Sequence, residues 1–151
     1  MTAVFGNGID ISFEAWKDMG DYQYHFVGAS GSAVGYVGKV YISGGSAGSS
    51  AATGSDPGPL GVLQNDPQVS GEASVRMVGS TQLYVNAGTC NIYFGGLLTC
   101  ASDSHGESID STATAAGSAI PFHAISLAYT TSDGVLIEAF VRPWGLMSSG
   151  S

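Results

Sequence analysis

The sequence predicts an all-β fold, a small barrel or sandwich, and two observations support this prediction. Short runs of aromatic and β-branched residues recur at a spacing of about 8–12 residues, with Gly and Pro between them, which is typical of such folds. No segment shows a sustained 3.6-residue apolar period with helix caps. The 23 glycines follow no collagen-like period and therefore indicate turns, bulges and loops.

Residues 1–20 form a predicted N-terminal arm. Apolar residues alternate at Ile9, Ile11, Phe13 and Ala15 as in a strand, and helical spacing fits this segment no better. The arm also carries the large aromatics Phe5, Phe13 and Trp16. Two interpretations stay open: the aromatics contact a partner surface, or the arm folds back onto its own core.

Residues 21–151 are predicted to form a single β domain. A low-complexity Gly/Ser/Ala/Pro stretch at 43–59 cannot bury enough apolar area to order itself, so we expect a flexible loop there. A kink is expected at Gly79-Ser80, and the last strand is expected to end at Pro143. The expected strands are Tyr22–Val27, Val34–Ile42, Leu60–Gln64, Ala73–Val78, Gln82–Val85, Leu97–Ala101, Ala119–Ala128 and Val135–Val141.

Charge argues against nucleic acid and membranes as partners. The net charge is −8, and the four basic residues, Lys17, Lys39, Arg76 and Arg142, are scattered. Binding to nucleic acid needs clustered cations, and an anionic membrane surface would repel this chain. No apolar run approaches the roughly 20 residues of a membrane span. The N-terminus lacks the basic and apolar regions of a signal peptide.

The sequence contains no convincing catalytic motif, so we expect no enzyme. Residues 44–48 match GxSxG around Ser46, but a nucleophile elbow needs a helix directly after the serine. Here the following residues are again rich in Ser, Ala and Gly, so we attribute the match to chance. Gly38-Lys39 resembles the end of a phosphate-binding P-loop, but Ala33 and Val40 stand at two positions that the motif requires to be Gly and Ser or Thr.

Metal and cofactor sites are not expected either. His25 and His123 lie in predicted strands, where a structural histidine is the simplest interpretation. Asp103 and His105 supply two metal ligand types, but they do not complete a shell, and a polar turn explains them better. Cys90 and Cys100 have no zinc-type spacing. We interpret them as small buried hydrophobes, with a disulfide across a hairpin as the alternative.

The order of these segments resembles the capsid decoration, or cement, proteins of tailed bacteriophages. The family pattern G-V-L-Q-N-x-P is similar to Gly61–Pro67, and a second pattern is matched in looser spacing by Gly71–Gly79. A later family turn is similar to Leu98–Gly106. The resemblance covers roughly residues 22–142. The long loop at 43–59 and the aromatic N-terminus depart from the family.

The resemblance implies a compact β-barrel or β-tulip fold without catalytic residues or cofactors. It implies a virion protein, made in the host cytoplasm, that binds the outer surface of the expanded phage capsid. Its partner would be the major capsid protein, whose subunit contacts it would stabilise as a trimer at threefold or quasi-threefold positions. Our hypothesis is that Phe5, Phe13 and Trp16 contact the capsid or a neighbouring protomer.

The alternative function is that of a β-sandwich carbohydrate- or receptor-binding module of a virion fibre or cell surface. Exposed aromatic rings that stack on sugars would be its signature, and Tyr129 and Trp144 are the candidates.

Overall fold

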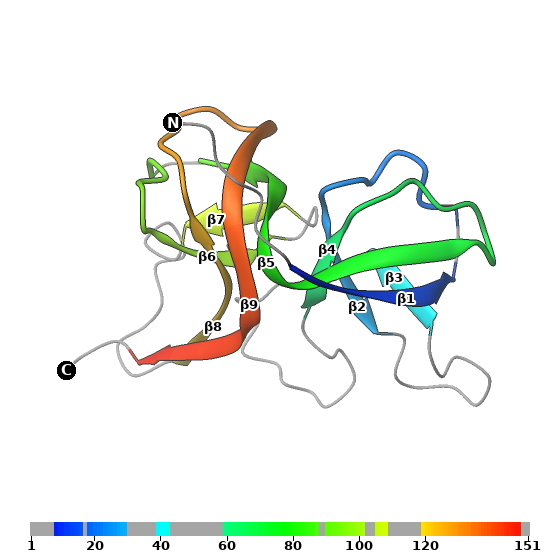
Figure 1. The fold of residues 1–151 in the computed structure, drawn as a ribbon. Helices are drawn as coiled ribbons and strands as arrows, with labels where there is room; N and C mark the ends of the chain where they lie inside the picture. Colours follow the sequence, from blue (N-terminus) through cyan, green and yellow to red (C-terminus); the bar gives the residue numbers. More distant parts are fainter. Residues whose placement is uncertain are drawn as a thin grey trace.

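The computed structural model describes residues 8–16, 18–29, 39–42, 59–87, 90–101, 105–108 and 119–148. These residues form strands and turns and contain no helix, which confirms the all-β prediction (Figure 1). The strands are β1 (Ile9–Ala15), β2 (Phe26–Ala29), β3 (Lys39–Ile42), β4 (Pro59–Leu63), β5 (Glu72–Asn86), β6 (Leu97–Cys100), β7 (Gly106–Ser108), β8 (Ala119–Ser126) and β9 (Val135–Ser148).

The described strands close into two rings that share β5. In the first ring, the first half of β5 pairs with β1 and β4, β4 pairs with β2, β2 with β3, and β3 with β1. In the second, the second half of β5 pairs with β9 and β7, β7 pairs with β6, β6 with β8, and β8 with β9. We call these rings barrel 1 and barrel 2. Figure 1 shows them side by side, with the long strand β5 running through both.

The two barrels are structural repeats, although the sequence shows no repeat. Each has the same strand order, with one parallel contact between its first and third strands and antiparallel contacts elsewhere. The register also agrees in all five contacts. The matching residue pairs are Ala15↔Val40 with Val85↔Gly106, Val27↔Ile42 with Leu98↔Ser108, Val27↔Gly61 with Leu98↔Ala124, Leu63↔Val75 with Ser126↔Ala139, and Phe13↔Ala73 with Leu83↔Ile137.

The turn before the second strand of each barrel repeats as well. In barrel 1 the His25 N–H donates to the Tyr22 carbonyl at 3.1 Å, and in barrel 2 the Gly96 N–H donates to the Tyr93 carbonyl at 2.9 Å. The third residue of each turn is left-handed, with φ of 65° at Tyr24 and 80° at Gly95. Such a φ is a genuine outlier for a bulky residue like tyrosine, so backbone strain is retained in barrel 1.

Strand β5 changes barrels at Gly79. Val78 pairs with Ile9 of barrel 1, whereas Gly79 already pairs with Val141 of barrel 2. Gly79 has a φ of 119°, and a Cβ added there would lie 2.6 Å from the Cα of Gly8. The kink predicted at this position is therefore present, but the strand continues through it, because glycine permits the bend without interrupting the pairing.

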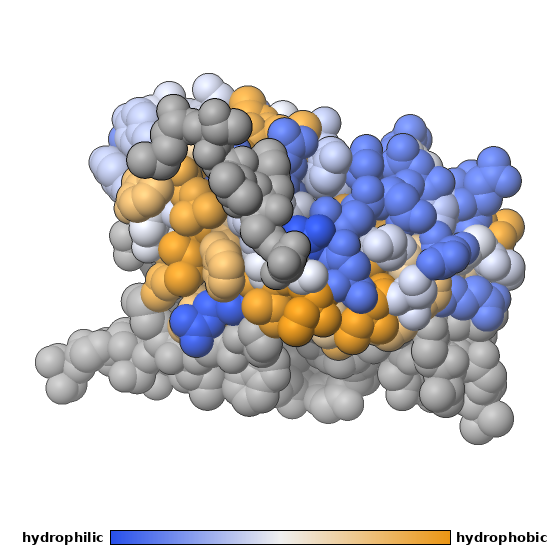
Figure 2. Space-filling model, viewed as in Figure 1, coloured by the Kyte–Doolittle hydropathy of each residue, from blue (hydrophilic) through white to orange (hydrophobic). Residues whose placement is uncertain are grey.

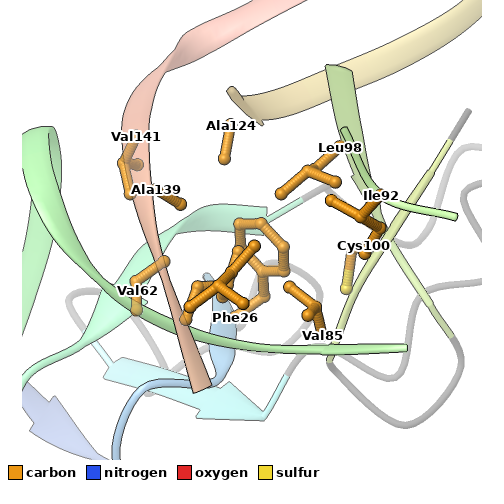
Figure 3. Close-up of a cluster of buried hydrophobic side chains, with 11 residues drawn as sticks. Phe26, Val62, Val85, Ile92, Leu98, Cys100, Ala124, Ala139 and Val141 are labelled. Atoms are coloured by element: carbon orange, nitrogen blue, oxygen red, sulfur yellow. The ribbon is translucent and has the colours of Figure 1, made fainter. Parts of the chain in front are cut away.

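The core is divided into two clusters that meet between the barrels. The cluster of barrel 1 contains Met19, Leu63 and Val75, and that of barrel 2 contains Leu83, Leu98 and Val141. Phe26 belongs to β2 of barrel 1, yet its fully buried ring packs into the cluster of barrel 2 (Figure 3). Val62 of β4 does the same. Barrel 1 therefore completes the core of barrel 2, and the two barrels cannot be separated without exposing it.

Two predicted boundaries are wrong. Tyr22–His25 forms a turn instead of the start of a strand, because its backbone is held by the left-handed Tyr24 and by hydrogen bonds to barrel 1. Strand β9 does not end at Pro143 but continues to Ser148. The register jumps there, from Ala124↔Val141 to Phe122↔Gly145, so the proline lies in a bulge, where its missing N–H is tolerated.

The segment predicted as an N-terminal arm contains a paired strand. From Ile9 to Glu14, β1 pairs with β5, and Glu14 and Ala15 also pair with β3. Arg76 of β5 reinforces this contact through a salt bridge to Asp10, which raises the pKa of the arginine through a side-chain hydrogen bond. Of the two interpretations left open, β1 follows the one in which the chain folds back onto its own core.

Candidate interaction surfaces

The three predicted contact residues have different environments. Phe5 lies outside the described residues. Phe13 is half-buried and packs against the core cluster of barrel 1. Trp16 follows β1 directly and exposes 42% of its surface. Of the two described residues, Trp16 is therefore the exposed one, while Phe13 contributes mainly to the packing of barrel 1.

A cluster of polar rings joins the two barrels. The Nε2 atoms of His25 and His105 lie 2.9 Å apart, and the ring of Tyr84 stacks on His105 and lies tilted against His25. The Nδ1 of His105 lies 2.8 Å from Asn86 Oδ1, which also accepts a hydrogen bond from the Gly134 N–H. His25 comes from barrel 1 and the other side chains come from barrel 2, so these contacts fix the relative position of the barrels.

Two further hydrogen bonds support this junction. The Tyr84 N–H donates to the carbonyl of Tyr24 at 3.0 Å, and the hydroxyl of Thr81 donates to Gln64 Oε1 at 2.9 Å. Tyr24 and Gln64 belong to barrel 1, whereas Thr81 and Tyr84 belong to barrel 2. Because Thr81 is buried, its hydroxyl needs this partner. The polar side chains at this junction therefore have a structural role, which is to hold the two barrels together.

Barrel 2 ends in a group of exposed aromatic rings, which we call the aromatic tip. It consists of Tyr93, Phe94 and Tyr129. Tyr93 and Tyr129 lie 5.5 Å apart between ring centroids, held by a β-bridge between Ile92 and Thr130. Phe94 is 74% exposed, the largest fraction among the exposed large hydrophobics of the described chain. Exposed aromatic groups of this kind mark interaction sites.

Apolar side chains are also exposed along β1 and β9. Ile9 and Ile11 lie on β1, and Leu136 and Phe140 lie on β9. Figure 2 shows hydrophobic residues on this face over the β8–β9 side of barrel 2 and near β1, where the barrels meet. The surface near β9 also holds Arg142, whose guanidinium lies 5.0 Å from the centre of the Phe122 ring.

The chemical candidates from the sequence form no reactive site in the described chain. No group of three His, Cys, Asp or Glu among the described residues could hold a metal. Cys90 and Cys100, both described, are not joined by a disulfide. Ser46 and Asp103 lie outside the described residues. Asp18 and Asp21 are both exposed to solvent. No described helix is long and apolar enough to cross a membrane.

The sequence interpretation missed the aromatic tip apart from Tyr129. The strands expected from the sequence include no turn at Tyr93-Phe94-Gly95-Gly96. Two aromatic residues before a Gly-Gly pair are nevertheless a usable signal for one. Glycine favours a left-handed turn, and the side chains that precede it then project from the apex. Trp144 belongs to β9, but its side chain is outside the described part.

Comparisons with known proteins find a solved structure with a similar fold, but they assign the chain to no family. No family model matches the chain, and no curated protein matches it. Among solved structures, the N base of the head fibre protein gp8.5 of bacteriophage phi29 is similar, with a TM-score of 0.56 and 12% sequence identity. The similarity covers 89% of this chain and 94% of that one, so it includes both barrels.

Proposed function

We propose that this chain is a structural virion protein that binds the outer surface of a phage head. The observation that supports the proposal is the similarity of almost the whole chain to the base of a phage head fibre. The fold suits this role, because two barrels that share a strand and a core form a stiff body with apolar side chains on several faces. No catalytic step or cofactor is part of the proposal.

Its partner in this proposal is the major capsid protein, and a trimer at threefold or quasi-threefold positions is the expected arrangement. If the chain binds the expanded shell more tightly than the precursor shell, it stabilises the expanded state by that difference in affinity. Weak contacts repeated by symmetry then add up over the shell. Phe5, Phe13 and Trp16 remain our contact candidates, on the shell or on a neighbouring copy.

Co-sedimentation with heads tests this function. Purified chain is mixed with expanded heads and with precursor shells of the phage that encodes it, and the bound chain is quantified by gel. We expect saturable binding to expanded heads and weaker binding to precursor shells. Absence of binding to both would refute the proposal.

The proposed contact residues are tested by small deletions and point substitutions, because removal of the whole N-terminal arm would also disturb the fold. Deletion of residues 1–16 would remove β1 and thereby open barrel 1, so loss of binding would be uninformative. Deletion of residues 1–7 tests Phe5, and Trp16→Ala tests the exposed indole. Val69→Ala is the matched control, because Val69 is also exposed but lies in the loop between β4 and β5. Full occupancy by both altered proteins would refute the contact hypothesis for Phe5 and Trp16.

Carbohydrate or receptor binding is the alternative function, and the aromatic tip favours it. The rings of Tyr93 and Tyr129 are exposed side by side, and Asn91 Nδ2 lies 3.4 Å from the hydroxyl of Tyr93, so apolar and polar groups adjoin. A glycan array with the Tyr129→Ala variant as control separates the two functions. Binding of a glycan that is lost in this variant would support the alternative.

A further inference from the structure

The contact between the barrels inside one chain has two sides. Barrel 1 supplies the docking side, which consists of the turn Tyr22–His25 and of Gln64 at the end of β4. Barrel 2 supplies the receiving side, which consists of Thr81, Tyr84 and Asn86 on β5, together with His105. Since the barrels are repeats, barrel 1 has its own equivalent of the receiving side, and barrel 2 has its own equivalent of the docking side.

The equivalent receiving side on barrel 1 is exposed and combines apolar residues with the charged Glu14, which the same register makes the equivalent of Tyr84. Ile11 pairs with Val75 just as Thr81 pairs with Ala139, so Ile11 is the equivalent of Thr81. Thr81 is only 3% exposed because barrel 1 covers it, whereas Ile11 is 43% exposed. By the same register, Trp16 is the equivalent of Asn86, and it too is exposed.

The equivalent docking side on barrel 2 is exposed as well. It is the turn Tyr93–Gly96, which has the same hydrogen bonds as Tyr22–His25: Tyr24 N–H donates to Leu63, and Gly95 N–H donates to Ser126. His25 is covered in the junction and Tyr22 is half-buried against the core of barrel 1, but Tyr93 is 59% and Phe94 is 74% exposed. Glycines at positions 95 and 96 leave the two aromatics as the projecting groups of this turn.

We propose that the turn Tyr93–Gly96 of one copy docks along β1 of a second copy, between Ile11 and Trp16, at the position equivalent to the contact between barrels within each chain. Nine large hydrophobics are exposed in the described residues, and four lie on these two equivalent surfaces: Ile11, Trp16, Tyr93 and Phe94. A second copy is the occupant because the contact continues an interface that the chain already forms with itself.

Such a contact is heterologous, since each copy uses a different surface on each side. Repetition through successive copies closes a ring or extends a chain of molecules. The inference goes beyond the proposed function, because it concerns the protein alone in solution and does not require a phage head.

A complementation experiment tests the proposal. One variant, Ile11→Ser with Trp16→Ser, loses the receiving side, and a second, Tyr93→Ser with Phe94→Ser, loses the docking side. Sedimentation velocity at high protein concentration gives the mass as multiples of the 15.3 kDa chain. We expect the unmodified chain to assemble, each variant alone to be monomeric, and an equimolar mixture of the two to form dimers but nothing larger.

Val69→Ser is the matched control and is expected to assemble like the unmodified chain, because Val69 is 62% exposed but lies on neither surface. Urea unfolding of each variant verifies that the fold is retained. If a double variant does not fold, Phe94→Ser and Trp16→Ser alone replace the pairs. A monomeric unmodified chain, variants that still assemble, or a mixture that stays monomeric would each overturn the proposal.

Discussion

We expect acid to destabilise the folded chain through His123, because burial disfavours the charged form of this side chain. His123 lies on β8, is 5% exposed, and in the described structure neither ring nitrogen has a hydrogen-bond partner. Burial therefore lowers its pKa from 6.5 to about 4, since the charged form would lose its hydration without compensation. Thr99, on the neighbouring strand β6, has a buried hydroxyl that is also without a hydrogen-bond partner in the described structure.

The sign follows from proton uptake. Between pH 6.5 and about 4 the unfolded chain binds a proton at His123, whereas the folded chain does not. The free energy of unfolding therefore falls as the pH falls through this window, and above or below it the contribution is constant. A difference of about 2.5 pKa units at roughly 1.4 kcal/mol each gives a total loss of about 3 kcal/mol, of which about 2 kcal/mol is lost by pH 5.

Urea unfolding of the unmodified chain and of His123→Phe at pH 7.5 and pH 5 measures this effect. Phenylalanine keeps a ring next to Phe26 but does not titrate. His25, His105 and the carboxylates are common to both proteins, so their contributions cancel in the comparison. We expect the variant to gain about 2 kcal/mol relative to the unmodified chain between the two pH values. The reasoning is refuted if the stability difference between the proteins is the same at both.

Three further substitutions test how the barrels are joined, each measured by urea unfolding. Phe26→Ala should lower the free energy of unfolding by about 3–5 kcal/mol, because the ring fills the core of barrel 2. The control Phe140→Ala changes an exposed ring and should lower it by less than about 1 kcal/mol, and equal losses would contradict the role of Phe26 in that core. Gly79→Ala should cost about 2 kcal/mol or more, since a Cβ there meets Gly8 at a left-handed φ; an unchanged unfolding midpoint would show that β5 does not need this bend. Arg76→Met should lower the free energy of unfolding by about 1–3 kcal/mol, because Asp10 loses its cation. The loss should be smaller when Asp10 is replaced by Asn, and an equal loss in both backgrounds would argue against the ion pair.

Much of the local structure could be predicted from residue patterns. Leu60–Gln64 is recognisable as a strand because the Asn65-Asp66-Pro67 turn follows it, and it corresponds to β4 within one residue. Gly79-Ser80 marks the bend in β5 because glycine adopts the required φ without steric cost. The predictions fail at Tyr22–His25 and at Pro143. There, tertiary hydrogen bonds hold a strained tyrosine in a turn, and a bulge accommodates a residue that normally ends a strand.

The exposed residues of the candidate interaction surfaces were harder to predict from the sequence than the strands. Trp16 was identified from its type and is exposed, but Phe13 has the same character and is half-buried in the core of barrel 1. Alternation along a strand shows that two faces exist, but the partners across the sheet decide which of them is covered. The same limit applies to Tyr93 and Phe94, whose exposure depends on how their turn is placed at the end of barrel 2.

The all-β class and most strand positions can be predicted from residue order alone, because they follow from local alternation and from Gly and Pro. The sharing of β5 by two barrels of the same register is visible only in the folded chain, because pairing between distant strands leaves no local signal when the side chains of the repeats have diverged. The duplication also pairs residues of different exposure, since Thr81 is covered by barrel 1 whereas its equivalent Ile11 is exposed.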